Sequence, residues 1–138
     1  MIHKHPIRVY YEDTDAGGIV YHASHIRFAE RGRTEFLRSV GWTNSQIAKE
    51  LDTLFVVRHI EADYHKPAFL DDLLEMRTHV SKVKNSSFIM RQELYRGDVM
   101  LCGINVVIAC ISHEGNLVKI PEKLRNTLQD NLVDEQGK

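Results

Sequence analysis

The chain has 138 residues, of which 43% are hydrophobic and 27% are charged, and its formal net charge is −1 with histidines neutral. This composition is that of an ordinary globular domain, and the near-neutral charge excludes a broad attraction to nucleic acid or anionic membranes. No apolar run approaches the roughly 20 residues that span a bilayer, and the first residues lack the apolar segment of a secretory signal. We therefore expect one domain over residues 1–138, no transmembrane segment, no nucleic-acid partner and a cytoplasmic location.

The first predicted element is a strand over residues 6–12. Apolar and polar side chains alternate along it, as in a strand with one buried face. Tyr11 falls on the same face as Ile7 and Val9. This pattern alone predicts a packed core tyrosine, and a role for Tyr11 in a site is the alternative.

An acidic turn follows over residues 12–15, and Gly17 and Gly18 come directly after it. Glycines allow a positive φ and leave room for a ligand beside the backbone. Asp15 thus places a carboxylate just before a helix start, whose free N–H groups can bind an anion or a developing oxyanion. This arrangement suits catalysis, and the alternative is an ordinary turn, in which Asp, Thr and Gly are common.

A long helix is predicted over residues 24–40, where apolar residues recur at helical spacing. Ser24 is the expected N-cap, and Gly41 is placed to end the helix. Ala29 and Gly32 are small enough to let another backbone approach closely. A sheet wrapped around this helix would use that closeness.

The second half of the chain predicts a short helix and then a set of strands. The helix starts at a capping box formed by Thr43 and Gln46. The strands are predicted over residues 54–65, 73–83, 87–96 and 99–111. Successive hairpins build an antiparallel sheet, and one long helix covers one face of it. The predicted fold class is α+β.

The strand over residues 54–65 starts with apolar side chains on both faces. This pattern suits burial by the helix on one side and by a partner subunit on the other, and an ordinary central strand is the alternative. We therefore expect a homo-oligomer.

The last third of the chain contains both cysteines, a final helix and a polar tail. Cys102 and Cys110 fall on one predicted strand, roughly 26 Å apart, so they cannot form a disulfide with each other there. Both are expected to be small buried residues. The helix begins at Pro121, and the tail over residues 134–138 is expected to be frayed.

Other catalytic motifs find little support. Asp15, His22 and His25 are close enough in sequence to make a metal site conceivable. The chain has no HExxH, CxxC, GxSxG or GxGxxG pattern, however. We expect no metal and no cofactor.

One long motif covers residues 11–22: Tyr11-x-Asp13-Thr14-Asp15-x-x-Gly18-x-Val20-Tyr21-His22. Together with residues 28–35, 55–58 and 70–75, it resembles the 4-hydroxybenzoyl-CoA thioesterase family of hotdog-fold hydrolases. Within that family, the chain is most similar to the acyl-CoA thioesterase branch associated with the bacterial Tol-Pal system. The resemblance extends over nearly the whole chain.

The resemblance implies a hotdog fold, in which a curved antiparallel sheet wraps around one long helix, and hydrolysis of acyl-CoA thioesters without a metal. It implies that Asp15 is the catalytic carboxylate, that Tyr11 and His22 accompany it, and that the backbone N–H of His22 polarises the thioester carbonyl. Asp15 can act as nucleophile or as general base, and the resemblance leaves this open. It also implies a homodimer or homotetramer.

Two further functions stay open at this point. One is hydration or dehydration of an acyl thioester on the same fold. The other is a non-catalytic interaction protein of the Tol-Pal envelope system or of the lipid-synthesis machinery. The length of the acyl chain, and its carrier, which is coenzyme A or an acyl carrier protein, also stay open.

Overall fold

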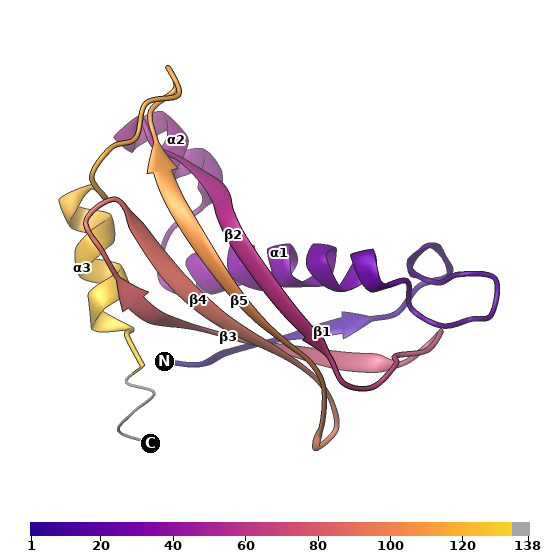
Figure 1. Ribbon diagram of the computed structural model, residues 1–138. Coiled ribbons are helices and arrows are strands. Elements are labelled where there is room, and N and C mark those ends of the chain that lie inside the picture. Colours follow the sequence, from indigo (N-terminus) through magenta and orange to yellow (C-terminus); the bar gives the residue numbers. More distant parts are fainter. Residues whose placement is uncertain (134–138) are drawn as a thin grey trace.

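The computed structural model of the protein describes residues 1–133, so the predicted frayed tail, residues 134–138, lies outside the described residues. The elements in chain order are β1 (His3–Arg8), the 3₁₀ turn η1 (Tyr11–Asp13), α1 (His22–Ser39), α2 (Asn44–Leu51), β2 (Leu54–Tyr64), β3 (Leu73–Val83), β4 (Ser87–Arg96), β5 (Val99–Ile111) and α3 (Glu122–Asp130). Figure 1 shows the sheet curving around α1. This is the predicted α+β hotdog architecture.

The strands form one antiparallel sheet in the order β1-β3-β4-β5-β2. Consecutive hairpins join β3, β4 and β5, as predicted. The expectation that β2 also pairs with the strand after it is wrong, because β2 pairs with β5 instead. The segment between β2 and β3 carries the chain to the far side of β4, so β2 and β1 are the two edges of the sheet.

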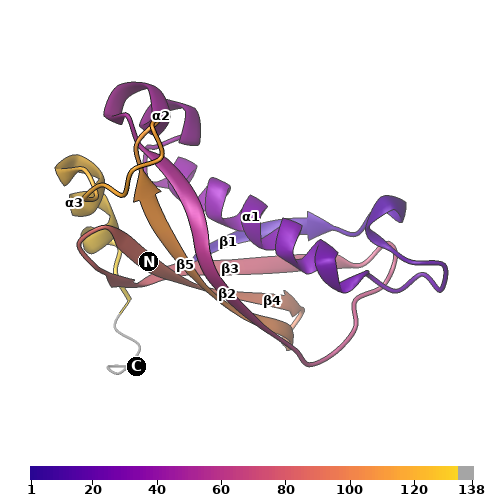
Figure 2. The same ribbon diagram turned by 45° about the horizontal axis from the view of Figure 1, so that its top comes forward.

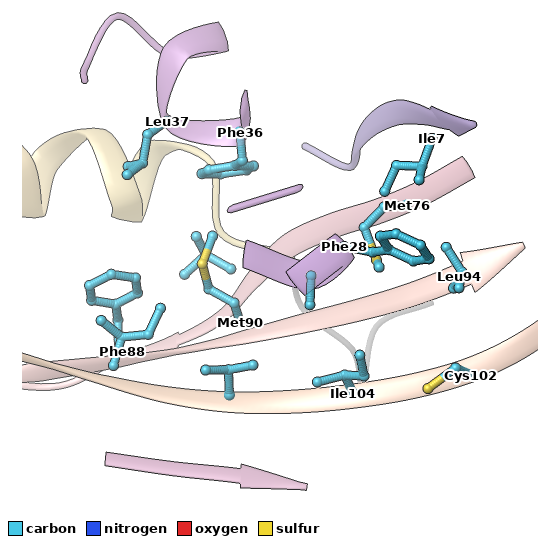
Figure 3. Packing of buried hydrophobic residues seen from close by; sticks show 14 of the residues in the cluster. Ile7, Phe28, Phe36, Leu37, Met76, Phe88, Met90, Leu94, Cys102 and Ile104 are labelled. Atoms are coloured by element: carbon cyan, nitrogen blue, oxygen red, sulfur yellow. The ribbon is translucent and has the colours of Figure 1, made fainter. Parts of the chain in front are cut away.

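The helix α1 lies against the concave face of the sheet (Figure 2). A Cβ added to Gly32 would lie 2.6 Å from Cγ of Met76 and 3.0 Å from Nε2 of Gln92. The predicted close approach of sheet and helix at Gly32 is therefore confirmed. In Figure 3, side chains from both layers fill the space between them; the labelled members include Phe28, Phe36, Leu37, Met76, Met90, Leu94 and Ile104.

The two ends of α1 differ in how well the sequence predicted them. At the C-terminal end, Gly41 has φ of 96° and its N–H donates to the carbonyl of Arg38, while the N–H of Trp42 donates to the carbonyl of Leu37. This is a Schellman motif, and the predicted stop is confirmed. At the N-terminal end, the predicted cap at Ser24 is wrong, since α1 begins at His22 and Ser24 lies inside its first turn.

The predicted strand over residues 6–12 is wrong at both ends, because β1 spans His3–Arg8. The carboxylate Oδ2 of Asp13 accepts a hydrogen bond from the N–H of Tyr10 at 2.8 Å, and the N–H of Asp13 donates to the carbonyl of Tyr10. These local bonds bend the chain into η1. Tyr11 consequently has 82% of its surface exposed, so the expectation of a packed core tyrosine is also wrong.

The strand β2 lies at an edge of the sheet, so the alternative of a central strand is wrong. Val56 and Val57 are 39% and 49% exposed. The helix before β2 is capped as predicted, since the hydroxyl of Thr43 accepts from the N–H of Gln46. The β2 edge therefore presents apolar side chains and unpaired backbone groups on its outer side.

The remaining predictions for the C-terminal third agree with the structure. Cys102 and Cys110 are both buried, unpaired residues of β5. Pro121 is the N-cap of α3, whose Leu124 and Leu128 are fully buried. Among residues 1–133, no helix is long and apolar enough to cross a membrane.

Candidate active site

The loop between η1 and α1 holds Asp15 at the surface. Its carboxylate Oδ1 accepts hydrogen bonds from the N–H groups of Gly17 at 2.9 Å and Ile19 at 3.3 Å. The loop also closes through a bond from the N–H of Gly18, at φ of 77°, to the carbonyl of Asp15. Within residues 1–133, the second oxygen, Oδ2, has no hydrogen-bond partner. One carboxylate oxygen thus builds the turn, and the other is left unpaired within the described chain.

The start of α1 is tied to η1 through the backbone of Asp13. The carbonyl of Asp13 accepts from the N–H of Tyr21 at 3.0 Å and from the buried hydroxyl of Ser24 at 3.1 Å. This explains why Ser24 is not the N-cap: its hydroxyl serves the preceding loop. The first N–H groups of a helix have no intrahelical acceptor, and in the described chain no other acceptor contacts the N–H of His22. That N–H is available to a ligand.

The three predicted site residues come from one short loop, but their side chains do not contact one another in the described structure. Tyr11 holds the loop through its carbonyl, which accepts from the N–H and the hydroxyl of Thr14. His22 is exposed, and the centre of its ring lies 4.5 Å from that of the Tyr21 ring, with the two planes tilted by 44°. Asp15, which lies between Tyr11 and His22 in the sequence, is also exposed.

Tyr64 lies beside this loop and was not identified by the sequence patterns, whereas His25, its neighbour, was considered there only as a conceivable metal ligand. The Tyr64 hydroxyl donates to the carbonyl of His22 at 3.1 Å. The His25 ring packs edge-on against Tyr64 at 5.1 Å and lies 6.2 Å from the Phe28 ring. Tyr64 stands at the end of an otherwise unremarkable strand pattern, 42 residues from His22, so no local signal could have found this contact.

His25 is 3% exposed, and neither of its ring nitrogens has a hydrogen-bond partner among residues 1–133. Burial lowers its pKa, and the nearby carbonyls of Tyr21 and His22 partly offset that effect by raising it. The imidazole is therefore neutral near pH 7. Across residues 1–133, no group of three or more His, Cys, Asp or Glu side chains is placed to hold a metal ion.

A cavity of about 380 Å³ opens between α1, α2 and β2. Its strand side is lined by apolar side chains, and its helix side by polar side chains together with Leu37 and Ile47. The residues include Glu30, Arg33 and Asn44 on the helices, and Phe55, Phe88 and Met90 on the strands. Glu30 comes eight residues after His22 along α1, roughly 12 Å further. The α1 residues that line the cavity thus lie from the middle of the helix onward, whereas the Asp15 loop precedes its first residue.

Comparisons with known proteins agree on one family. The sequence profile of the thioesterase superfamily matches residues 17–103. The acyl-CoA thioesterase YbgC of Haemophilus influenzae is 47% identical over 106 residues, which cover 77% of this chain and 78% of the relative. The acyl-CoA thioester hydrolase YbgC of Shigella flexneri is 41% identical over 107 residues, covering 77% of this chain and 79% of the relative.

A solved structure extends the similarity to three dimensions. The crystal structure of a probable thioesterase from Bartonella henselae superposes with a TM-score of 0.85 at 40% sequence identity, covering 88% of this chain and all of that one. A curved antiparallel sheet around one long helix is the hotdog fold, and the relatives that match this chain are thioester hydrolases. The chain belongs to the thioesterase superfamily and is a thioester hydrolase.

Proposed function

We propose that the protein hydrolyses acyl-CoA thioesters with Asp15 as the essential carboxylate. The thioester carbonyl oxygen accepts a hydrogen bond from the N–H of His22, which stabilises the negative charge that develops there. Asp15 either takes a proton from the water that attacks the carbonyl carbon, or attacks that carbon itself to form a mixed anhydride, which water hydrolyses after coenzyme A has left. In both cases the C–S bond breaks, and coenzyme A leaves as a thiolate that gains a proton. In this proposal, Tyr11 and the His22 ring position the carboxylate, the water or the leaving group.

The observation that carries this proposal is the pairing of a free carboxylate oxygen with a free helix N–H. Asp15 offers Oδ2 at an exposed position, and the N–H of His22 has no acceptor in the described structure. The partial positive charge of the helix start favours an oxyanion there. An oxyanion donor contributes roughly 10²–10³-fold in rate and a general base roughly 10²–10⁴-fold. The reaction needs no metal or cofactor.

The proposal extends to a homo-oligomer built on the β2 edge. Tyr64, which contacts the start of α1, ends β2, whereas Phe55 and Val57 of the cavity wall lie at its other end. Two copies of β2 paired antiparallel over their full length would place the Asp15 loop of one subunit beside the cavity of the other. The exposed apolar side chains of this edge support such a contact, because exposed edges are ordinarily protected by charges or covered.

The decisive experiment measures free-thiol release from a panel of acyl-CoAs, short to long and including one aromatic, for wild type and Asp15→Asn. Because the amide oxygen of Asn can still accept from the N–H groups of Gly17 and Ile19, the loop should keep its fold while turnover falls about 10²-fold or more. Asp98→Asn, an exposed residue of the β4–β5 turn, is the matched control and should keep full activity. Undiminished turnover by Asp15→Asn would refute the assignment.

Additional assays test the alternative reactions, the alternative acyl carrier and the proposed oligomer. If the reaction is hydration or dehydration, product analysis will detect an enoyl or hydroxyacyl thioester. If the free-thiol assay finds no turnover with acyl-CoAs, the assay is repeated with acyl groups carried on an acyl carrier protein. Sedimentation of wild type and Val57→Lys tests the assembly. A wild-type oligomer that dissociates in the variant supports the β2 interface, and a monomeric wild type would refute it.

A further inference from the structure

The cavity between α1, α2 and β2 contains a cation held in a fixed orientation. Arg33 is half-buried in its wall, and its Nη1 donates to Oε1 of Gln92 at 3.0 Å. Gln92 is fully buried, and its Nε2 donates to the carbonyl of Ala29 at 2.7 Å and to Oγ1 of Thr78 at 3.0 Å. Because these two bonds are made by Nε2 of Gln92, Oε1 faces Arg33, and the guanidinium is held in place by a residue of the sheet.

Most of the hydrogen-bonding capacity of this guanidinium is unused. A guanidinium has five N–H donors in a planar fork, and in the described structure only the bond to Gln92 occupies one of them. Within residues 1–133, no carboxylate lies within 4 Å of Arg33. Glu30, one turn earlier on α1, lines the same cavity but stays exposed and does not reach that distance. A partly desolvated cation without a paired anion is costly.

Apolar side chains form most of the remaining cavity wall, beside the polar Glu30, Thr34, Asn44 and Thr53. These apolar side chains come from α1, β2, β4 and β5 and include Leu37, Phe55, Val57, Phe88, Met90 and Ile108. Leu37, Phe88 and Met90 lie together at one end of the view in Figure 3. A volume of about 380 Å³ is at the small end of the range for small-molecule sites. The cavity therefore combines a hydrocarbon-lined floor with one oriented cation.

We propose that this cavity binds an apolar carboxylate, with its carboxylate on Arg33 and its hydrocarbon against the strand side. Planar guanidinium and carboxylate groups form paired, charge-assisted hydrogen bonds, which a neutral ligand cannot match. Glu30 opposes the ligand's charge and weakens its binding. Two kinds of ligand carry such a carboxylate. One is the free acid that thioester hydrolysis releases, and the other is a dicarboxylic acyl thioester, through its distal carboxylate. The binding itself does not depend on Asp15.

Titration calorimetry of the full chain with sodium octanoate, 1-octanol and methyl octanoate tests the proposal. Octanoate should bind about tenfold or more tightly than the two neutral probes, because a charged hydrogen bond is lost with each of them. Arg33→Met should remove that preference without weakening octanol binding. Glu30→Gln, at an exposed position, should tighten octanoate severalfold and needs no rearrangement of the core. Equal affinity for octanoate and octanol in wild type, or no response to either substitution, would overturn the proposal.

Kinetics with octanoyl-CoA and suberoyl-CoA, which carries a free distal carboxylate, distinguish the two kinds of ligand. A lower KM for suberoyl-CoA that Arg33→Met abolishes assigns the site to a dicarboxylic acyl group. Equal KM values with inhibition by octanoate assign it to the released acid. Asp15→Asn should bind octanoate like wild type. If the protein shows no thioesterase turnover but still binds octanoate through Arg33, the proposed function fails and this inference stands.

Discussion

The hydroxyl of Tyr64, the last residue of β2, donates a hydrogen bond of 3.1 Å to the carbonyl of His22, the first residue of α1. This bond joins the sheet edge to the helix start that we propose as the oxyanion site. Its removal in Tyr64→Phe keeps the ring contact with His25 and loses only the hydroxyl. We expect an unfolding free energy lower by about 0.5–1.5 kcal/mol, and a fall in kcat with little change in KM.

Tyr95→Phe is the matched control for this substitution. The Tyr95 hydroxyl donates to Oε1 of Glu93 at 3.3 Å on β4, away from the helix start. Its removal should leave kcat unchanged even where it costs some stability. Urea unfolding and steady-state kinetics on both variants separate the two effects. If Tyr64→Phe and Tyr95→Phe have the same kcat as wild type, Tyr64 does not position the site.

The buried His25 predicts a pH dependence of stability. In the unfolded chain this imidazole titrates near its ordinary value of 6.5, whereas burial lowers its pKa in the folded protein. Between the two values only the unfolded chain binds the proton, so the free energy of unfolding falls as the pH drops below 6.5 and levels off below the folded pKa. Above pH 6.5 the effect vanishes.

His25→Phe should remove part of this dependence. Phenylalanine fits the aromatic contacts with Tyr64 and Phe28 and takes up no proton. Part of the slope should persist, because burial also lowers the pKa of His3. Urea unfolding at several pH values from 7.5 to 5 measures it. A variant whose stability falls with pH as steeply as that of wild type would contradict the assignment to His25.

The sequence predicted local features of the fold well and long-range ones poorly. The bounds of β3, β4 and β5 follow from alternation and from the turn at Gly97, which are signals between neighbouring residues. The pairing of β2 with β5 and the bond between Arg33 and Gln92 join residues far apart in the chain, and no local pattern contains them. Tyr11 was wrongly predicted to be buried, because the Asp13 carboxylate accepts a hydrogen bond from the N–H of Tyr10 and so ends the alternating strand before Tyr11.

The candidate site shows the same division. The family motif predicted that Asp15 and the N–H of His22 belong together, and the structure places both beside the start of α1. Their roles remain predictions until the variants are measured. Tyr64 belongs to no motif, and the family resemblance at residues 28–35 and 55–58 did not indicate a cavity around Arg33, because each feature depends on how β2 lies against α1. Such contacts can be identified only from the three-dimensional structure, in which β2 is paired with β5 and packed near α1.

Gly32→Ala tests the close packing of α1 on the sheet. The added Cβ would lie 2.6 Å from Cγ of Met76 and 3.0 Å from both Nε2 of Gln92 and Oγ1 of Thr78. Such overpacking costs about 1–3 kcal/mol, although alanine is otherwise the better helix former. Ser45→Ala, at an exposed position of α2, should change stability by less than about 0.5 kcal/mol. Thermal or urea unfolding distinguishes the two, and a stabilised Gly32→Ala would show that the sheet yields at this contact.

Cys102 and Cys110 should be unreactive in the folded protein. Burial raises the pKa of each thiol to about 11, so at pH 7.5 the reactive thiolate is outnumbered by thiol by about three orders of magnitude or more. Both side chains are also closed off from reagents. We expect no labelling by a thiol reagent over minutes in buffer and labelling of both cysteines in urea, measured by mass spectrometry. Enzymatic turnover should survive the reagent, and its loss on labelling of the native protein would show that a thiol is exposed near the site.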